Sequence, residues 1–297
     1  MNITVHGLSF EKEFAPFLEN LITVLHQHQA NIFLSPTFHK ALTNTGAKAS
    51  HFELISSREQ LSIMDFVISV GGDGTLLDTV SYVGAMEIPM IGINTGRMGF
   101  LATIAKEDIE KAIQVLFSHK FTIEDRSLIG LDTDLNLAFD MRPFNGTAFG
   151  LNEFTVHKRD TSSMITVHTY IDDEYLNSYW ADGLIVATPT GSTGYSLSCG
   201  GPLISPAAKN FVITPVSPHN LNVRPMIVPD DSVISFKIEG RSEKFLISLD
   251  SRSTAVDANV HLTVRKEKFV AKLVKFYDYS FFDTLRQKLN WGFDMRN

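Results

Sequence analysis

The stretch 66–77 reads Phe66-Val67-Ile68-Ser69-Val70-Gly71-Gly72-Asp73-Gly74-Thr75-Leu76-Leu77 and passes from an apolar run into a glycine turn. The run Phe66–Val70 is rich in apolar and β-branched residues, which predicts a buried strand. After the turn, apolar residues recur at the helical spacing of Leu76, Leu77, Val80 and Val83. A strand, a glycine turn and a helix start direct backbone N–H groups at an anion. The stretch therefore predicts an α/β fold with an anion site at the carboxyl end of this strand.

Asp73 is the one charged residue of this turn, and its position has three interpretations. A carboxylate among phosphate-binding amides repels phosphate unless it holds a metal ion or takes up a proton. The bland alternative is that Gly71-Gly72-Asp73-Gly74 is an ordinary strand-to-helix turn in which Asp73 caps the helix. The residues of the turn alone leave metal ligand, general base and helix cap open.

Composition bounds the class of protein. The chain has 297 residues, 44% of them hydrophobic and 20% charged, which indicates a folded protein of one large or two smaller domains. Its apolar runs are shorter than the roughly 20 residues of a membrane span, so no membrane association is expected. The start Met1-Asn2-Ile3-Thr4-Val5 has the pattern of a strand rather than a signal peptide.

The net charge and the cysteine count limit which binding partners and which cellular location are expected. The net charge is −7 and no lysine or arginine cluster is present, which argues against nucleic acid. Cys199 is the single cysteine, so no internal disulfide forms and a reducing, cytoplasmic location is expected. An anionic substrate would then be held by backbone amides, a few placed cations and a metal ion.

Residues 1–120 alternate between strand and helix patterns. The expected strands are Ile3–His6, Asn31–Leu34, Phe66–Val70 and Met90–Ile93, and the expected helices cover 14–29, the residues after Thr75, and 109–116. Residues Thr43–Ser50 are small and polar, which predicts a loop. This alternation predicts a doubly wound, parallel α/β domain that binds a nucleotide through the Gly-Gly-Asp-Gly turn.

Residues 121–275 change to short strand patterns separated by turn signals. A hairpin is expected from 164–171 and 175–180 around Asp172-Asp173-Glu174. Further strands are expected at 154–157, 183–187, 211–214, 233–238, 245–249, 260–265 and 270–274. The spacing predicts a β-rich, sandwich-like second domain. Residues 276–297 form a tail, with a helix over 280–289, that we expect to pack back on the first domain.

A second glycine-rich loop follows the strand that begins at Met90. It reads Asn94-Thr95-Gly96-Arg97-Met98-Gly99-Phe100 and lies about twenty residues after the first. Two parallel strands that end in glycine loops can form one phosphate cradle, with Arg97 as its cation. An ordinary turn with a solvated arginine is the alternative. The P-loop pattern of Walker-type ATPases is absent.

Two more segments are candidates for a ligand site. Residues 181–202 run from a strand into a loop dense in glycine and hydroxyl residues, with Tyr195 available to pack on a ligand. Asn152-Glu153 stands at the start of the strand 154–157, where polar residues also occur without function. A carboxylate such as Glu153 can accept hydrogen bonds from both hydroxyls of a ribose. His219 lies in no metal-ligand pattern and is taken as structural.

These motifs resemble the signatures of the NAD kinase family along nearly the whole chain. The first loop matches Gly-Gly-Asp-Gly-Thr-Leu-Leu, which diacylglycerol-type lipid kinases and phosphofructokinases carry in related form. The second matches Gly-x-Asn-x-Gly-x-x-Gly-Phe-Leu, and Asn152-Glu153 matches a third element. Residues 182–198 match Asp-Gly-Leu-Ile-Val-x-Thr-Pro-Thr-Gly-Ser-Thr-x-Tyr-x-x-Ser, the most specific of the four, and residues 218–225 also resemble the family.

The sequence departs from the family pattern at three positions. Gly194 stands where many members have alanine, and its backbone contact is expected to persist. Ser163 and Trp180 stand where some bacterial relatives have an arginine and a polar or charged residue. The contacts to nicotinamide and across a subunit boundary are therefore expected to differ from those relatives.

The resemblance implies an ATP-dependent NAD kinase that moves the γ-phosphate of ATP to the 2′-hydroxyl of the adenosine ribose of NAD. It implies Mg²⁺ or another divalent metal with ATP, no dedicated metal-ligand set in the chain, and a homo-oligomer, a dimer or a tetramer. Asp73 is the implied catalytic base. The implied ATP-binding residues are Gly71, Gly72, Gly74, Thr75, Asn94, Gly96, Arg97 and Gly99. The implied NAD-binding residues are Asp73, Gly74, Asn152, Glu153, Asp182, Thr190, Thr193, Gly194, Tyr195 and Ser198.

Two rival functions stay open at this point. A lipid kinase of the diacylglycerol type shares the first loop, but it would need a basic or apolar membrane-facing surface, and the acidic chain shows no basic amphipathic helix. A sensor that binds NAD(P) without turnover is the other rival, and the presence of Asp73 argues against it.

Overall fold

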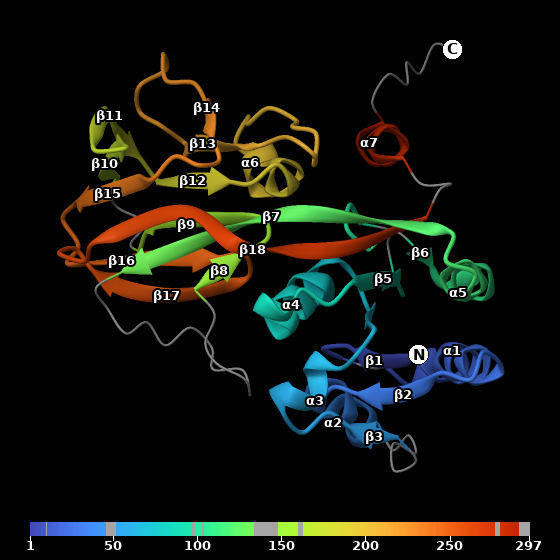
Figure 1. The fold of residues 1–297 in the computed structure, drawn as a ribbon. Coiled ribbons are helices and arrows are strands. Elements are labelled where there is room, and N and C mark those ends of the chain that lie inside the picture. The colour runs from blue at the N-terminus through green and yellow to red at the C-terminus, as the bar shows by residue number, and fades with distance from the viewer. Residues whose placement is uncertain are drawn as a thin grey trace. The chain divides into compact units, whose positions relative to one another are not determined.

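The chain divides after Asp125 and again after Val270 in the computed structural model (Figure 1). One unit contains Met1–Asp125 together with Ala271–Asn297, and the other contains Arg126–Val270. The structure describes residues 1–9, 11–45, 52–96, 99–102, 104–133, 148–159, 163–276 and 280–290. From residue 46 on, the predicted loop Thr43–Ser50 lies outside the described residues, as do Arg97 and residues 277–279 of the tail.

The first unit is built on a parallel sheet. Its strands are β1 (Asn2–His6), β2 (Asn31–Leu34), β3 (Glu53–Leu54), β4 (Phe66–Val70), β5 (Met90–Asn94) and β6 (Ile104–Ala105). They lie in the order β5-β4-β1-β2-β3, with β6 beside β5, and every pair is parallel. The chain therefore winds outward from β1 in one direction and then in the other. The crevice that such a reversal opens lies at the carboxyl ends of β1 and β4.

Helices cover both faces of this sheet, as the doubly wound prediction requires. They are α1 (Ala15–Gln27), α2 (Pro36–Asn44), α3 (Arg58–Ser62), α4 (Asp73–Val83) and α5 (Ile109–Phe117), with short 3-10 turns η1 (Lys12–Phe14), η2 (Gly84–Met86) and η3 (Lys106–Asp108). Figure 1 shows α1 and α5 on one side of the sheet and α2, α3 and α4 on the other. A core of aliphatic and aromatic side chains from β1, β2, β4 and β5 joins both layers. The chain ends its described part in α7 (Phe281–Leu289), which confirms the predicted terminal helix.

The second unit consists of two antiparallel sheets. One has the order β14-β13-β12-β9-β16-β17 and the other contains β11-β10-β15-β18, with β7 and β8 joined to it. The bounds are β7 (Phe121–Thr133), β8 (Phe149–Gly150), β9 (Glu153–Lys158), β10 (Ile165–Ile171), β11 (Glu174–Ala181), β12 (Gly183–Ala187), β13 (Asn210–Val216), β14 (Met226–Pro229), β15 (Ile234–Glu239), β16 (Lys244–Leu249), β17 (Arg252–Asp257) and β18 (Leu262–Phe276). Inward side chains of both sheets form one apolar core.

The predicted β10–β11 hairpin is confirmed, and its turn has a physical cause. Asp172 and Asp173 have φ of 50° and 66°, the left-handed conformation that both central residues of a tight hairpin turn adopt. The second unit also contains the short η4 (Thr190–Thr193) and α6 (Tyr195–Ser198). These two elements follow β12 and carry most of the hydroxyl-rich segment.

One prediction about the strands was wrong, and one strand was missed. The strands predicted at 260–265 and 270–274 are parts of one strand, β18, which begins at Leu262, has 15 residues and continues through Lys266-Glu267-Lys268. The long strand β7 was not predicted, since its first half carries Glu124, Asp125 and Arg126 among exposed or half-buried positions. In both cases charged side chains project from a strand edge or surface, so composition indicates a loop where backbone pairing continues.

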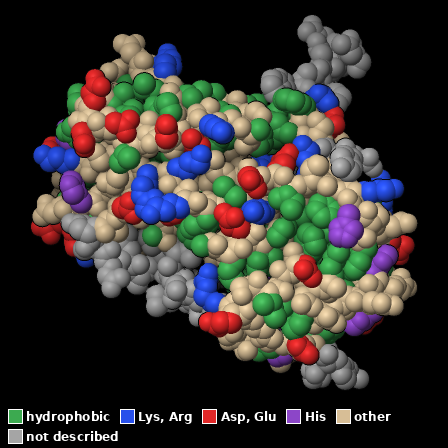
Figure 2. Space-filling view, viewed as in Figure 1, with side chains coloured by type: hydrophobic (Ala, Val, Ile, Leu, Met, Phe, Trp, Pro, Cys, Tyr) green, Lys and Arg blue, Asp and Glu red, His purple; other side chains and the backbone are tan. Residues whose placement is uncertain are grey.

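Charged side chains are interspersed on the face shown in Figure 2, where Lys and Arg alternate with Asp and Glu. Such mixing agrees with the absence of a basic cluster in the sequence. Among the described residues, no helix is both long and apolar enough to cross a membrane.

Candidate active site

The first loop leaves β4 through a glycine that no other residue could replace. Gly71 has φ of +154°, and a Cβ built on it would lie 2.2 Å from Thr75 Oγ1. The sharp exit places Gly72 at the N-cap of α4 and Asp73 at the first helical position. The α4 N-terminus thus lies at the carboxyl end of β4, where the parallel sheet places its ligand crevice.

Asp73 does not cap α4. Its carboxylate accepts three backbone N–H groups of the second glycine loop: Phe100 N donates to Oδ2 at 2.7 Å, and Leu101 N and Ala102 N donate to Oδ1 at 3.1 and 3.0 Å. The helix-cap interpretation is therefore wrong, because the Asp73 carboxylate binds the backbone of the second glycine loop. Asp73 joins the two glycine loops that the sequence predicts to act together, and within the described part of the chain Oδ2 accepts the Phe100 N–H and has capacity for a further donor.

The second loop is organised by Asn94 at the end of β5. Asn94 Oδ1 accepts Gly96 N at 2.8 Å, and Asn94 Nδ2 donates to Ala102 O at 3.3 Å. Asn94 is buried, so its amide serves the loop's own backbone. Asn94 therefore holds the loop in its conformation, and its role toward a ligand stays a prediction.

Three glycines of these loops face open space. A Cβ built on Gly72, Gly74 or Gly96 would meet no protein atom within 4 Å, and none of the three has a left-handed φ. Neither local crowding nor backbone conformation within the chain requires glycine there. Room for a ligand to approach the bare backbone is the remaining reason, and phosphate groups use such sites.

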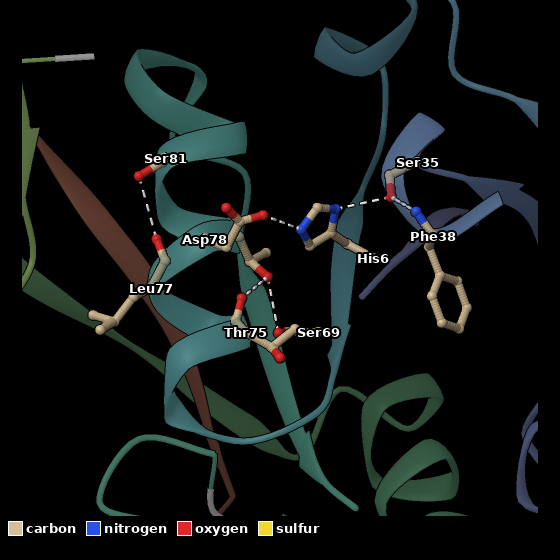
Figure 3. Close-up of polar contacts among 9 residues, drawn as sticks. His6, Ser35, Phe38, Ser69, Thr75, Leu77, Asp78 and Ser81 are labelled. Carbon is tan, nitrogen blue, oxygen red and sulfur yellow. Dashed lines mark hydrogen bonds and ion pairs between the residues drawn. The ribbon is translucent and has the colours of Figure 1, made fainter. Parts of the chain in front are cut away.

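Buried hydrogen bonds, shown in Figure 3, hold helix α4 to the neighbouring strands. His6 Nε2, at the end of β1, lies 2.7 Å from Asp78 Oδ2 of α4, and His6 Nδ1 lies 2.8 Å from Ser35 Oγ. Thr79 Oγ1 also donates to Ser69 Oγ of β4 at 2.8 Å. These contacts tie α4 to β1 and β4, so the helix that begins at Asp73 has a defined position in its unit.

The second unit assembles a different group of predicted residues around Asn152-Glu153. Thr188 N donates to Asn152 O at 2.8 Å, and Thr188 Oγ1 donates to Leu151 O at 2.6 Å. A Cβ on Gly191 would be 2.1 Å from Asn152 O, and one on Gly194 would be 3.1 Å from Glu153 Oε2. The segment after β12 therefore packs directly on Asn152-Glu153, as the predicted NAD residues require.

Two side-chain atoms in this group are buried without a partner. Among the residues that the structure describes, no donor lies within hydrogen-bond distance of the specific atoms Asn152 Oδ1 and Glu153 Oε2, although Glu153 is 91% buried. Burial, together with the charge of Asp250, raises the pKa of Glu153 to about 8, and the backbone N–H of Tyr195 opposes the rise. Buried acceptors without donors are rare in native proteins, so this pair indicates a ligand that brings donors.

The remaining predicted NAD residues divide by their surroundings. The ring of Tyr195 stacks on His157 with centroids 5.5 Å apart, and burial lowers the pKa of His157. Asp182 forms an ion pair with Lys158 at 2.6 Å. Thr190 is buried and Thr193 Oγ1 donates to Thr190 O at 3.1 Å. Ser198 is exposed at the end of α6. Tyr195 and Gly194 thus lie with Glu153, and the carboxylate of Asp182 pairs with Lys158 while its charge also acts on His157 and Tyr195.

Sequence reasoning missed two positioning elements of these sites. The first is the His6–Asp78 contact, whose residues lie 72 positions apart. The second is Asp250, which binds the backbone of residues 151–153 from the β16–β17 turn. Leu249-Asp250-Ser251-Arg252 could have been identified as a turn, but no local pattern indicates its distant partner.

The described residues contain no group of three or more His, Cys, Asp or Glu side chains that could hold a metal ion. Amides at a helix N-terminus and two glycine loops suit the phosphates of a nucleotide, which carry their own divalent cation. Fold and site together have the features of a nucleotide-dependent phosphotransferase.

Comparison with known proteins identifies the family. The profile described as ATP-NAD kinase N-terminal domain matches residues 16–121, and that of the ATP-NAD kinase C-terminal domain matches residues 151–276. NAD kinases of Cytophaga hutchinsonii and Flavobacterium psychrophilum are 49% and 43% identical to the chain, each over its full length and that of the relative. The chain belongs to the ATP-NAD kinase family.

Two solved structures share the fold. An NAD kinase from Archaeoglobus fulgidus, in complex with ATP, has a TM-score of 0.73 at 25% identity and covers 98% of this chain and 99% of its own. Yeast NADH kinase, complexed with NADH, has a TM-score of 0.85 at 23% identity and covers 100% and 89%. The second comparison bears on the fold alone.

Proposed function

We propose a division of labour between the two units for the reaction of the family, in which ATP phosphorylates NAD. The chain is an ATP-dependent NAD kinase: the γ-phosphate of ATP passes to the 2′-hydroxyl of the adenosine ribose of NAD and gives NADP and ADP. The first unit holds the ATP phosphates and the second unit holds NAD. The observation that carries this assignment is the buried, unpartnered pair Asn152 Oδ1 and Glu153 Oε2.

The ATP phosphates bind the backbone of the two glycine loops. Gly72, Gly74 and Gly96 leave their backbone open, and the N-terminus of α4 adds a partial positive charge. Gly71, Asn94 and Gly99 set the conformation of the two loops, and Thr75 follows in the first turn of α4. Arg97, outside the described residues, would supply a cation.

Asp73 takes the proton of the attacking hydroxyl. The 2′-oxygen forms a bond to the γ-phosphorus while the bond to the β-phosphate oxygen breaks, and the hydroxyl proton moves to the Asp73 carboxylate. A 2′-hydroxyl is a weak nucleophile at neutral pH, so a positioned base lowers the barrier. Its hydrogen bonds to Phe100, Leu101 and Ala102 fix the carboxylate in one orientation.

NAD binds the second unit through hydroxyl and amide donors that satisfy Asn152 and Glu153. Ribose hydroxyls donate to Glu153 Oε2 once that carboxyl is ionised, and the adenine amino group or a hydroxyl donates to Asn152 Oδ1. The exposed Tyr195 ring packs on a flat part of the dinucleotide. Gly194 keeps the space in front of Glu153 clear, because its hypothetical Cβ would lie 3.1 Å from Oε2.

Magnesium enters as part of the substrate MgATP in this proposal. Mg²⁺ is commonly bound by one or two carboxylates and by substrate phosphates. The ion would neutralise charge on the transferring phosphate. We further propose a homo-oligomer, a dimer or a tetramer, and a cytoplasmic location, which the single, unpaired Cys199 supports.

One assay tests the function and separates it from its rivals. The purified chain is mixed with ATP, Mg²⁺ and NAD, and NADP is measured with an NADP-specific dehydrogenase. NADP formation that depends on ATP supports an NAD kinase. NAD binding without NADP supports a sensor, and phosphorylation of diacylglycerol in place of NAD supports a lipid kinase.

A further inference from the structure

Asp250 occupies the turn between β16 and β17 and binds three consecutive backbone N–H groups. Leu151 N donates to Oδ2 at 2.8 Å, and Asn152 N and Glu153 N donate to Oδ1 at 2.7 and 3.2 Å. Its own N–H donates to Glu153 O at 3.0 Å. A single turn residue thus determines the path of the backbone that carries both unpartnered acceptors.

The same hairpin holds the residues just before this segment. The buried Arg252 guanidinium donates to Phe149 O. A Cβ on Gly150 would lie 2.9 Å from Asp250 Oδ1. The backbone at residue 150 therefore passes so close to the Asp250 carboxylate that a side chain there would force a shift. Asp250 also has φ of 52°, a conformation that aspartate tolerates better than most residues.

We propose that Asp250 is a positioning residue of the dinucleotide site, which holds residues 151–153 in place and sets the electrostatic surroundings of Glu153. It touches neither nucleotide in this assignment and acts through Asn152 and Glu153. The inference rests on the proposed function, because it takes Asn152-Glu153 as the NAD-binding pair.

Besides its hydrogen bonds to residues 151–153, Asp250 affects the pKa of Glu153 through its charge. Burial raises the pKa of both Asp250 and Glu153, but three amide donors and Arg252 oppose the rise at Asp250. At Glu153 only the Tyr195 N–H opposes the rise, and the charge of Asp250 adds to it. The titratable groups that face Glu153 are Asp250 from the hairpin and Tyr195 from α6. Removing the Asp250 charge therefore eases ionisation of Glu153.

The test compares Asp250→Asn with a matched control, Asp230→Asn. Asp230 is also a buried turn aspartate of the second unit, and it pairs with Lys266 at 2.6 Å rather than with residues 151–153. Asparagine at 250 offers one acceptor oxygen where the carboxylate offers two. We expect Asp250→Asn to raise KM for NAD about tenfold or more, with KM for ATP unchanged. The control should lose thermal stability and keep both KM values.

The pH profile of kcat/KM for NAD separates positioning from plain stability. In the parent, activity should rise as Glu153 ionises near pH 8. In Asp250→Asn the midpoint should move to lower pH, because the charge that opposes ionisation is gone. A purely structural role would leave the midpoint in place, and an unchanged midpoint with unchanged KM for NAD would overturn the inference.

Two further variants keep the outcomes distinct. If Asp250→Asn does not fold, Arg252→Lys is measured instead and must raise KM for NAD while that for ATP stays constant; an unchanged KM for NAD would again overturn the inference. Glu153→Gln tests the underlying assignment. If Glu153→Gln raises KM for NAD and the hairpin variants do not, the positioning role fails alone. If Glu153→Gln also leaves KM for NAD unchanged, the assignment of the dinucleotide site fails with it.

Discussion

Gly99 approaches Asp73 so closely that a Cβ built on Gly99 would lie 1.9 Å from Asp73 Oδ1. The contact joins the second glycine loop to the first helical residue of α4. Position 99 therefore needs glycine for steric reasons, because the φ of Gly99 is not left-handed and would not by itself require glycine. It also means that the orientation of the Asp73 carboxylate and the path of residues 99–102 are set together.

This relationship predicts that Gly99→Ala lowers kcat strongly. The added methyl group must displace either the carboxylate or the loop, so the base is misplaced and about 1–3 kcal/mol of unfolding free energy is lost with its hydrogen bonds. The matched control is Gly96→Ala, whose Cβ would meet no protein atom. It should leave thermal stability unchanged and raise KM for ATP. Equal melting temperatures for Gly99→Ala and the parent would contradict this reading.

Glu153→Gln should weaken NAD binding selectively. Loss of a charge-assisted hydrogen bond costs about 1.5–3 kcal/mol, or roughly ten- to a hundredfold in affinity. We therefore expect a raised KM for NAD and an unchanged KM for ATP in steady-state kinetics above pH 8, where the Glu153 carboxyl is ionised. An NAD KM equal to that of the parent, accompanied only by lower stability, would make Glu153 structural.

The same substitution should change how stability depends on pH. The folded-state pKa of Glu153, about 8, is above its ordinary value of 4.5, so the folded protein retains a proton that the unfolded chain releases. This contribution is complete below pH 4.5 and is lost as pH rises toward 8. Glutamine removes the dependence, so Glu153→Gln should gain stability relative to the parent between pH 5 and 8. Denaturant unfolding at both pH values measures the difference, and parallel behaviour of the two proteins would contradict it.

Local features of the sequence were sufficient for the strand Phe66–Val70, its glycine turn and the hairpin at Asp172-Asp173, because backbone conformation there depends on neighbouring residues. The same features failed for β18, since Lys266-Glu267-Lys268 interrupts the apolar pattern without interrupting the pairing. Helix α2 was missed because its stripe is short, although Ser35 accepts Phe38 N and Pro36 begins the helix.

The candidate sites show the same limit. The glycine loops and Asn152-Glu153 were predicted as parts, because each is a short motif with its own chemistry. What Asp73 binds was not predicted, since its partners Phe100–Ala102 are 27–29 residues away. Asp250 contacts Leu151 across 99 residues, and only tertiary structure brings a turn to so distant a backbone.

Tyr195→Ala should weaken NAD and NADP together. NADP differs from NAD by one phosphate at the reacting hydroxyl, so the product occupies the same place and competes with NAD. The Tyr195 ring is 39% exposed beside Glu153 and stacks on His157, which leaves one face for a ligand. Affinities of both dinucleotides by calorimetry are compared with KM for ATP. A rise in KM for ATP alone would mean that the two nucleotide sites are exchanged.

Asp78→Ala should destabilise the first unit more than Asp78→Asn. Alanine removes the acceptor that lies 2.7 Å from the buried His6 Nε2, at a cost of about 1.5–3 kcal/mol. Asparagine keeps an oxygen for the same hydrogen bond. Chemical denaturation should therefore rank the parent above Asp78→Asn and Asp78→Asn above Asp78→Ala. NAD affinity should stay near that of the parent, because these contacts lie outside the second unit; equal stability of the two variants would show that the His6 contact contributes little.

The central claim is that Asp73 accepts the proton of the 2′-hydroxyl, and kcat of Asp73→Asn against Mg²⁺ concentration tests it most directly. Asparagine retains one acceptor oxygen for the amides of residues 100–102 but cannot take a proton. Loss of a general base costs about 10²–10⁴ in rate. We predict a fall in kcat of at least a hundredfold that excess Mg²⁺ does not restore, with NAD affinity by calorimetry near that of the parent. A variant that turns over within a few-fold of the parent, or that recovers at high Mg²⁺, would contradict the assignment of Asp73 as the base.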